Sequence, residues 1–184
     1  MKMKKTLKII GIILLMLIVF REIIFRSVIK YNAIGTRPEI EIISENLIEK
    51  INSKIVNREI DAKSIIEIAN KITRDELQFS TGNVSSNPNE LINTNKANCV
   101  GYSAMFNSIS NYVIRMNNLQ NEISSEHKIG QIIMFGNNLH QYFENPFFKD
   151  HDFNEITDNK TGEKILIDPS VSDLFWIDRI SSKK

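Results

Sequence analysis

The stretch Asn98–Phe106 constrains the fold of this chain most, because a polar, Asn-rich segment gives way there to a helical pattern. After that point apolar side chains recur on one helical face: Phe106, Ile109, Val113 and Met116. This spacing predicts a helix that begins near Asn98 and packs its apolar face into the core. Cys99, the only cysteine of the chain, then lies in the first turn of that helix.

A thiol at a helix N-terminus lies at the positive end of the helix dipole, which favours the thiolate. A lone cysteine is equally common as a small buried apolar side chain, so its position alone leaves both interpretations open. One cysteine excludes an intramolecular disulfide framework and a multi-cysteine metal site. The three histidines, His127, His140 and His151, form no tight ligand pair. The sequence therefore predicts no metal site and no cofactor.

The charge of the chain is distributed unevenly. Residues 1–37 contain eight Lys and Arg against one acidic residue, whereas residues 38–184 contain 15 Lys and Arg against 21 acidic residues. The larger part is mildly acidic and shows no basic patch, which argues against nucleic acid as a partner. With 42% hydrophobic and 24% charged residues, the composition is that of a globular protein.

Residues 1–30 are predicted to be an uncleaved signal anchor that crosses a membrane once as a helix. Four lysines among the first eight residues precede the unbroken apolar run Ile9–Phe20. This run is shorter than the roughly 20 residues that a spanning helix needs, but snorkelling of Lys8 and Arg21 would extend the span to Leu7–Phe25. A cleaved signal peptide is the alternative. Either interpretation places the remaining chain outside the cytoplasm, in the periplasm or at the cell surface.

Residues 31–38 contain Gly35 and Pro38 and are predicted to be a linker, followed by one domain over residues 39–184. Helical periodicity predicts one amphipathic helix from Glu39 to about Ile55 and another from Ser64 to about Leu77. The segment 78–97 is poor in apolar residues and predicts a long loop, which would form a wall of a cleft beside the cysteine.

Four strands are predicted in the last third of the chain: Lys128–Phe135, Leu139–Phe143, His151–Ile156 and a strand from Lys164 ended by Pro169. The turn composition of residues 158–163 predicts that the last two strands form a hairpin. If that turn centres between Asn159 and Lys160, His151 lies directly across from Asp168, and a register shift of two leaves them diagonal neighbours. The carboxylate would then orient the imidazole.

Together, Cys99, His151 and Asp168 would form a thiol–imidazole–carboxylate triad. Their surroundings resemble the transglutaminase-like (papain-like) cysteine enzyme family. The core of this family reads Cys-x-Gly-Tyr-Ser/Ala at a helix start, His-Ala-Trp-(Asn)-Glu-Val on a strand, where the Asn is optional, and Asp-Pro on the next strand. The positions that carry the resemblance are Cys99, Gly101, Tyr102 and Ser103; His151, Asn154 and Glu155, with Phe153 for Trp and Ile156 for Val; and Asp168 and Pro169.

This resemblance spans roughly residues 65–175. It implies an α+β, transglutaminase-like fold in which the cysteine helix packs on an antiparallel sheet. It also implies acyl transfer through a thioester, either peptide or amide hydrolysis or amine transfer onto glutamine.

The candidate site residues follow from these motifs. The catalytic candidates are Cys99, His151 and Asp168, the oxyanion donors are the Cys99 backbone N–H and Gln78, and the substrate-cleft candidates are Tyr102 and Phe153. The rival base is His140 on a neighbouring strand, whereas His127 is expected in a loop. Tyr102, Phe106 and Trp176 are otherwise expected in the core, and Asp152 and Glu155 are expected on a solvated strand surface.

The sequence thus predicts a membrane-anchored cysteine hydrolase or acyltransferase that acts on a peptide or protein substrate. The alternative is a catalytically silent module of the same fold that binds an envelope protein or peptide. All three triad residues are present, which favours the enzyme.

Overall fold

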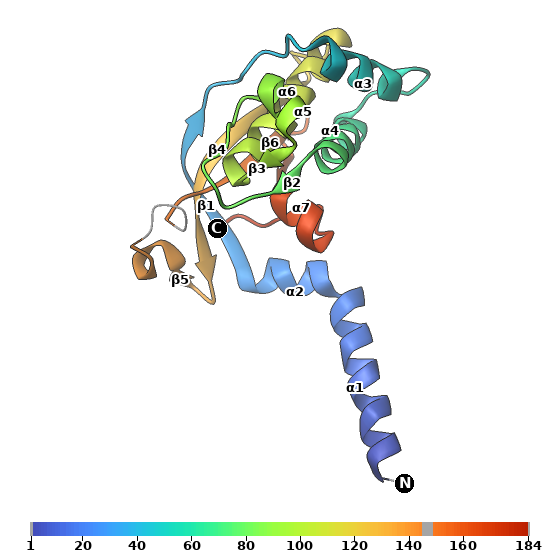
Figure 1. Cartoon of the computed structure of the whole chain (residues 1–184), viewed down its shortest axis with the longest axis vertical. Coiled ribbons are helices and arrows are strands. Elements are labelled where there is room, and N and C mark those ends of the chain that lie inside the picture. The colour runs from blue at the N-terminus through green and yellow to red at the C-terminus, as the bar shows by residue number, and fades with distance from the viewer. Residues whose placement is uncertain (1, 145–148, 184) are drawn as a thin grey trace.

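The computed structural model describes residues 2–144 and 149–183, and in these ranges the chain is α+β (Figure 1). The helices are α1 (Lys2–Val19), α2 (Arg21–Val28), α3 (Glu45–Ile55), α4 (Ala62–Glu76), α5 (Pro88–Thr94), α6 (Cys99–Met116), the 3₁₀ helix η1 (Leu139–Tyr142) and α7 (Pro169–Phe175). The strands are β1 (Ile29–Arg37), β2 (Gln78–Phe79), β3 (Lys96–Ala97), β4 (Ile123–Met134), β5 (Asn137–Asn138), β6 (His151–Asp158) and β7 (Lys164–Ile167).

The main sheet is antiparallel, with the order β1-β4-β6-β7 and with β5 paired to the end of β4. The C-terminal segment joins its two outer strands. The Ile180 N–H donates to the Leu166 carbonyl of β7 at 2.9 Å. On the other side, the Tyr31 N–H of β1 donates to the Ser181 carbonyl at 2.8 Å, and the Lys183 N–H donates to the Tyr31 carbonyl at 2.9 Å. The tail therefore closes the sheet and leaves neither outer strand unpaired there.

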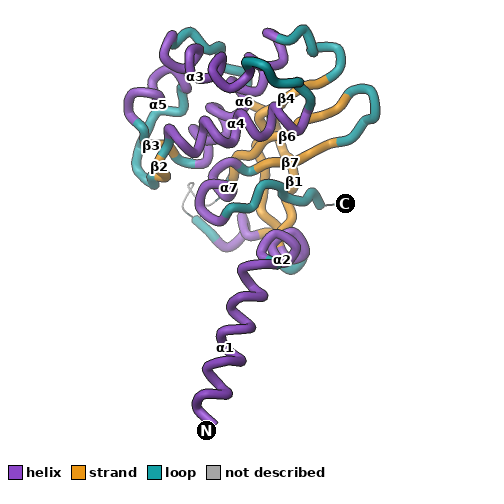
Figure 2. The backbone as a smooth tube through the Cα atoms, turned by 90° about the vertical axis from the view of Figure 1, so that its right-hand side faces the viewer, coloured by secondary structure: helices purple, strands orange, loops and turns teal. Residues whose placement is uncertain are grey.

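The larger hydrophobic core lies between the helices α3–α6 and the sheet, which Figure 2 shows as separate layers. Ile51 of α3, Ile68 of α4, Phe106 and Ile109 of α6 and Ile156 of β6 are all at most 2% exposed. Phe106 and Ile109 belong to the periodic set that predicts the α6 helix. The helix is therefore confirmed, and so is its inward face as far as Val113, but Met116 at the last position of the helix is 54% exposed and does not belong to that face.

A capping box sets the start of α4, and its N-cap Asp61 lies three residues before Ser64, where the helix was predicted to begin. The Asp61 carboxylate accepts the Ser64 N–H at 2.7 Å, and the Ser64 hydroxyl accepts the Asp61 N–H at 2.7 Å. Ser64 thus supplies the third helical position of the box rather than the cap. The preceding predicted helix is also shorter, because α3 begins at Glu45 instead of Glu39.

The predicted transmembrane helix is wrong: among the described residues, no helix is long and apolar enough to cross a membrane. The expected span Leu7–Phe25 is divided between α1 and α2 at Phe20. At about 1.5 Å per residue, the apolar part of α1 from Ile9 to Val19 is roughly 16 Å long, about half the hydrocarbon thickness of a bilayer. Arg21, which was expected to snorkel, donates instead to the carbonyls of Phe175 and Trp176 at 3.1 Å. A single N-terminal pass with an extracytoplasmic domain is therefore not supported.

The predicted linker, residues 31–38, forms most of β1 instead. Its register against β4 shifts between Ala33 and Gly35, which marks a bulge. A glycine inside a strand, here Gly35, is typical of such a bulge. The linker was predicted because glycine is also common in turns. The sheet therefore begins at Ile29, ahead of the predicted domain start at residue 39.

Candidate active site

The side chain of Asn98 fixes the start of α6 and thereby the position of Cys99. It accepts the N–H groups of Val100 at 3.1 Å and Gly101 at 3.2 Å, as an N-cap does. A Cβ at Gly101 would lie 2.9 Å from the Cβ of Ala97, so glycine lets the first helical turn pack against β3. Cys99 is the first residue of α6 and is 7% exposed.

His151 and Asp168 are hydrogen-bonded, with 2.5 Å between His151 Nε2 and Asp168 Oδ2. They are diagonal rather than directly opposed, because Asn154 pairs with Ile167 in the β6–β7 hairpin. The turn is centred one position later than assumed. Its geometry is set by the Asp158 carboxylate, which accepts the N–H groups of Lys160 and Thr161 at 2.8 and 2.9 Å.

Asp168 is completely buried and accepts hydrogen bonds at both carboxylate oxygens. The phenol of Tyr31 donates to Oδ2 at 2.7 Å, beside His151. Oδ1 accepts the Ser170 N–H at 3.1 Å, the Ser170 hydroxyl at 2.7 Å and the Val171 N–H at 3.1 Å. Asp168 is thus also the N-cap of α7, whose first residue is proline. These bonds fix the carboxylate relative to the imidazole.

The electrostatics of the pair favour an ionised carboxylate and a protonated imidazole. Burial alone would lower the pKa of His151, but the charge and hydrogen bond of Asp168 and a hydrogen bond with Cys99 raise that pKa well above its usual value. Burial alone would raise the pKa of Asp168, but His151, Ser170 and Tyr31 lower it. Because Nε2 of His151 is occupied by Asp168, Nδ1 is the ring nitrogen left for the Cys99 thiol.

Cys99 and His151 line a common cavity of about 290 Å³. The other residues around it are Phe79, Ile132, Leu139, His140, Phe143, Lys149 and Asp150. Its wall is therefore largely apolar, and Lys149 and Asp150 are the Lys and Asp among its lining residues. His140, the rival base, belongs to η1, and its Nδ1 lies 2.6 Å from the Lys149 carbonyl and 3.2 Å from the Asp150 carboxylate.

The remaining site candidates lie elsewhere. Gln78 is exposed, and its neighbour Phe79 lines the cavity instead. Tyr102 is fully buried and donates to the Asp173 carboxylate at 2.6 Å, which together with burial raises its pKa. Phe153 is 1% exposed and packs edge-on against Tyr31, with 5.3 Å between ring centroids. Both Tyr102 and Phe153 are thus buried, and neither lines the cavity.

Asp152 was expected on a solvated surface, and this expectation is wrong: it is 1% exposed. His127, predicted to lie in a loop, belongs to β4 and lies 2.7 Å from Asp152 through Nε2. Arg37 donates to the same carboxylate at 2.5 and 3.2 Å. Burial would raise the pKa of Asp152, but these two hydrogen-bond partners lower it. Trp176, expected in the core, is 66% exposed.

The sequence provided no indication of Tyr31, because this residue lies 137 positions before its hydrogen-bond partner Asp168. Phe79 carried a recognisable signal, being the only aromatic residue in the polar segment 78–97 that was expected to form a cleft wall. The Asp-Pro-Ser sequence at residues 168–170 is typical of a capped helix start, and it would have predicted α7.

Comparisons of this chain with protein-family models, with curated proteins and with solved structures find no match.

Proposed function

We propose that this chain is a cysteine-dependent acyl-transfer enzyme, a hydrolase or acyltransferase, that uses Cys99, His151 and Asp168. The observation that carries the proposal is the arrangement around His151. One ring nitrogen is bound 2.5 Å from a buried carboxylate, and a hydrogen bond with Cys99 contributes to the raised pKa of the imidazole. A nucleophile, a base and a group that orients the base are the three parts of a catalytic triad.

In the proposed resting state the Cys99 proton has already moved to Nδ1 of His151, so that a thiolate lies beside the protonated imidazole. The sulfur attacks a carbonyl carbon, forming a C–S bond and a tetrahedral oxyanion. Collapse of this intermediate breaks the C–N bond, and His151 returns the proton to the departing amine. Water or another amine then attacks the thioester, which releases the acyl product and restores the thiol.

The first turn of α6 offers one oxyanion donor. The Asn98 side chain occupies the N–H groups of Val100 and Gly101. In the part of the chain that the structure describes, no acceptor takes the Cys99 N–H. This N–H is therefore available to the oxyanion, at the positive end of the helix. We expect no contribution from Val100 or Gly101, because their N–H groups are already paired.

The cavity wall indicates the kind of acyl group that fits. Phe79, Ile132 and Leu139 would contact the group next to the reacting carbonyl, and apolar groups are favoured on such a surface. We therefore propose that the substrate is a peptide or amide with an apolar side chain beside the scissile bond.

The test compares alkylation of Cys99 by iodoacetamide in three proteins at pH 6, followed by mass spectrometry. We expect His151→Ala to slow alkylation at least about tenfold, because it removes the base and the positive charge beside the sulfur. His140→Ala is the matched control, since this histidine lines the same cavity but bonds to the Lys149 carbonyl. Equal rates in the wild type and in His151→Ala would contradict the proposed enzyme. A chloromethyl ketone with a Leu or Phe side chain should then label Cys99 faster than one with Asp.

A further inference from the structure

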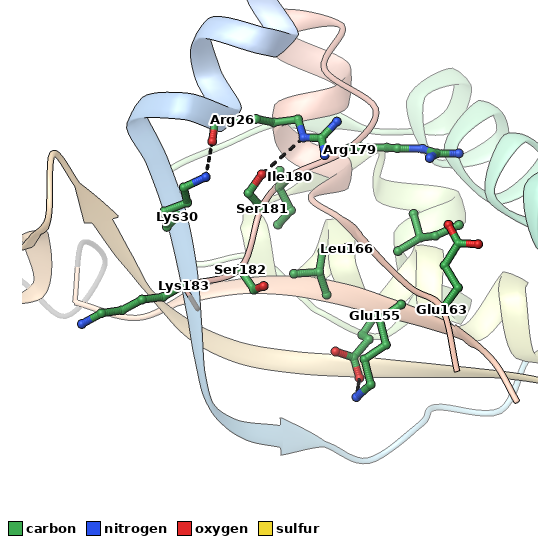
Figure 3. Close-up of a pocket in the computed structure, with 12 residues that line it drawn as sticks. Arg26, Lys30, Glu155, Glu163, Leu166, Arg179, Ile180, Ser181, Ser182 and Lys183 are labelled. Atoms are coloured by element: carbon green, nitrogen blue, oxygen red, sulfur yellow. Dashed lines mark hydrogen bonds and ion pairs between the residues drawn. The ribbon is translucent and has the colours of Figure 1, made fainter. Parts of the chain in front are cut away.

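A second, larger cavity of about 580 Å³ lies where the C-terminal tail crosses the β6–β7 hairpin and the junction of α2 and β1 (Figure 3). Twelve residues line it: Arg26, Lys30, Glu155, Glu163, Lys164, Ile165, Leu166, Arg179, Ile180, Ser181, Ser182 and Lys183. Five of these are cationic and two are acidic. This excess of positive charge is unexpected in a chain whose residues 38–184 are mildly acidic overall.

Arg26 lies 3.5 Å from the Glu22 carboxylate, whereas Lys30, Arg179 and Lys183 have no ion-pair partner among the described residues. Glu155 is paired with Lys164 at 3.0 Å and also lies 3.7 Å from Lys128, so it offers little compensation to the other cations. Lys30 donates to the backbone carbonyl of Arg26, a contact that leaves its charge unbalanced. The cavity therefore presents a net positive potential to solvent.

Two of the five cationic residues, the arginines, form the cationic side of the cavity. Figure 3 shows Arg26 and Arg179 on the same side of the cavity as Ser181, with Glu155 across the cavity and Lys183 apart from both arginines. Arg26 Nε donates to the Ser181 hydroxyl oxygen at 3.3 Å, which leaves the hydroxyl hydrogen free to donate. Two guanidinium groups and a hydroxyl donor suit an anion with several acceptor oxygens.

The floor of the cavity is apolar. Ile180 is 4% exposed and lies between the cationic side and Leu166, which is packed against the smaller hydrophobic core. A bare inorganic anion would leave this floor and most of the 580 Å³ unused. The ligand that fits both features has a highly charged head and an apolar part.

We propose that this cavity binds a phosphate monoester, with the phosphate between Arg26, Arg179 and the Ser181 hydroxyl and the organic part over Leu166 and Ile180. A phosphate monoester carries a charge of about −1.5 to −2 at pH 7, which matches two arginines better than a single carboxylate does. The site is separate from the Cys99 cavity, so it does not depend on the proposed catalytic function.

The experiment measures binding of phenyl phosphate to the full chain by isothermal titration calorimetry, and it measures binding of inorganic phosphate and of phenol, the two components of this ester, in the same way. Phenyl phosphate should bind more tightly than either component. Arg179→Gln should weaken the affinity for phenyl phosphate about tenfold, and the double variant that carries both Arg26→Gln and Arg179→Gln should bind still more weakly. Both losses are expected when charge-assisted hydrogen bonds are removed. Arg58→Gln is the matched control, because Arg58 is an exposed arginine paired with Glu67 outside this cavity.

A second arm identifies the source of the phosphate. Vesicles of phosphatidylcholine with and without phosphatidic acid present the same monoester on a lipid. An arginine-dependent gain in vesicle binding with phosphatidic acid assigns the site to a lipid headgroup, and binding of phenyl phosphate alone assigns it to a soluble ester. Binding of both probes at wild-type strength in the double variant would overturn the proposal, and so would binding of neither probe by the wild type. Arg179→Gln alone leaves the tail hydrogen bonds intact, so unfolding does not confuse the result.

Discussion

Replacing Asp168 by Asn tests the proposed triad most directly, because the amide keeps the shape of the carboxylate but changes what it offers His151. Its oxygen still accepts the N–H groups of Ser170 and Val171, so α7 stays capped. Its nitrogen faces the imidazole as a donor, and His151 Nε2 must then accept. The single ring proton then lies on Nδ1, and a protonated Nδ1 cannot accept the Cys99 proton. Acyl transfer should fall by about 10⁴-fold, as expected for the wrong tautomer.

The same variant has a defined effect on stability. The raised pKa of His151 contributes stability that is complete below its unfolded pKa of about 6.5 and is lost as pH rises through the folded pKa. The lowered pKa of Asp168 contributes stability that is present above about pH 4 and is lost as pH falls through the folded pKa. The pair therefore stabilises most between about pH 4 and 6.5. Breaking it there should cost about 3 kcal/mol, the lower end for a buried pair, because the His151 side chain is 21% exposed.

Urea unfolding at pH 5 and at pH 9 measures this effect, and iodoacetamide alkylation at pH 6 measures the chemical effect in the same preparations. We expect the difference in unfolding free energy between wild type and Asp168→Asn to be larger at pH 5 than at pH 9. Equal differences at the two pH values, together with an unchanged alkylation rate of Cys99, would refute the charge interaction and the role of the carboxylate.

Three further substitutions test the surroundings of the site. Tyr31→Phe removes one donor to buried Asp168 and should lower the free energy of unfolding by about 2 kcal/mol in urea, while the alkylation rate changes less than in the Asn variant. Asp152→Ala leaves a buried histidine and an arginine without their acceptor and should cost about 3 kcal/mol, with alkylation unchanged. Gly130→Ala places a Cβ 2.5 Å from Phe153 and should lower the melting temperature, at a cost of about 1–3 kcal/mol.

Local patterns predicted those parts of the fold that depend on near neighbours. The α6 helix follows from apolar periodicity and the Asn98 cap, and the β6–β7 hairpin follows from turn residues between two short strands. Both predictions are confirmed. The prediction that His151 contacts Asp168 holds although the register was wrong, because a shift of two residues keeps the two side chains on the same face of the sheet. For this reason the pair could be anticipated although the turn was misplaced.

Long-range packing decided the features that were missed. Residues 31–38 have linker composition, and they become a strand only because β4 offers a partner about 100 positions later. Asp152 has the polarity of a surface residue, and its burial depends on Arg37 from a distant strand. The apolar run before Arg21 is continuous in sequence, but contacts of Arg21 with the C-terminal region accompany the break between α1 and α2. Periodicity within a short window carries none of this information.

Tyr31 connects the closure of the sheet to the candidate site. Its backbone N–H and carbonyl bond to the tail at 2.8 and 2.9 Å, while its phenol donates to Asp168 at 2.7 Å and its ring contacts His151 edge-on at 5.8 Å. A shift of the tail therefore moves β1, and with it the donor that helps to hold the Asp168 carboxylate. Because burial and the Asp168 charge both raise the pKa of Tyr31, the phenol remains a donor throughout the pH range in which the pair is stable. The same residue thus closes the sheet and orients the acid, so the geometry of the proposed triad depends on the C-terminal segment as well as on the hairpin.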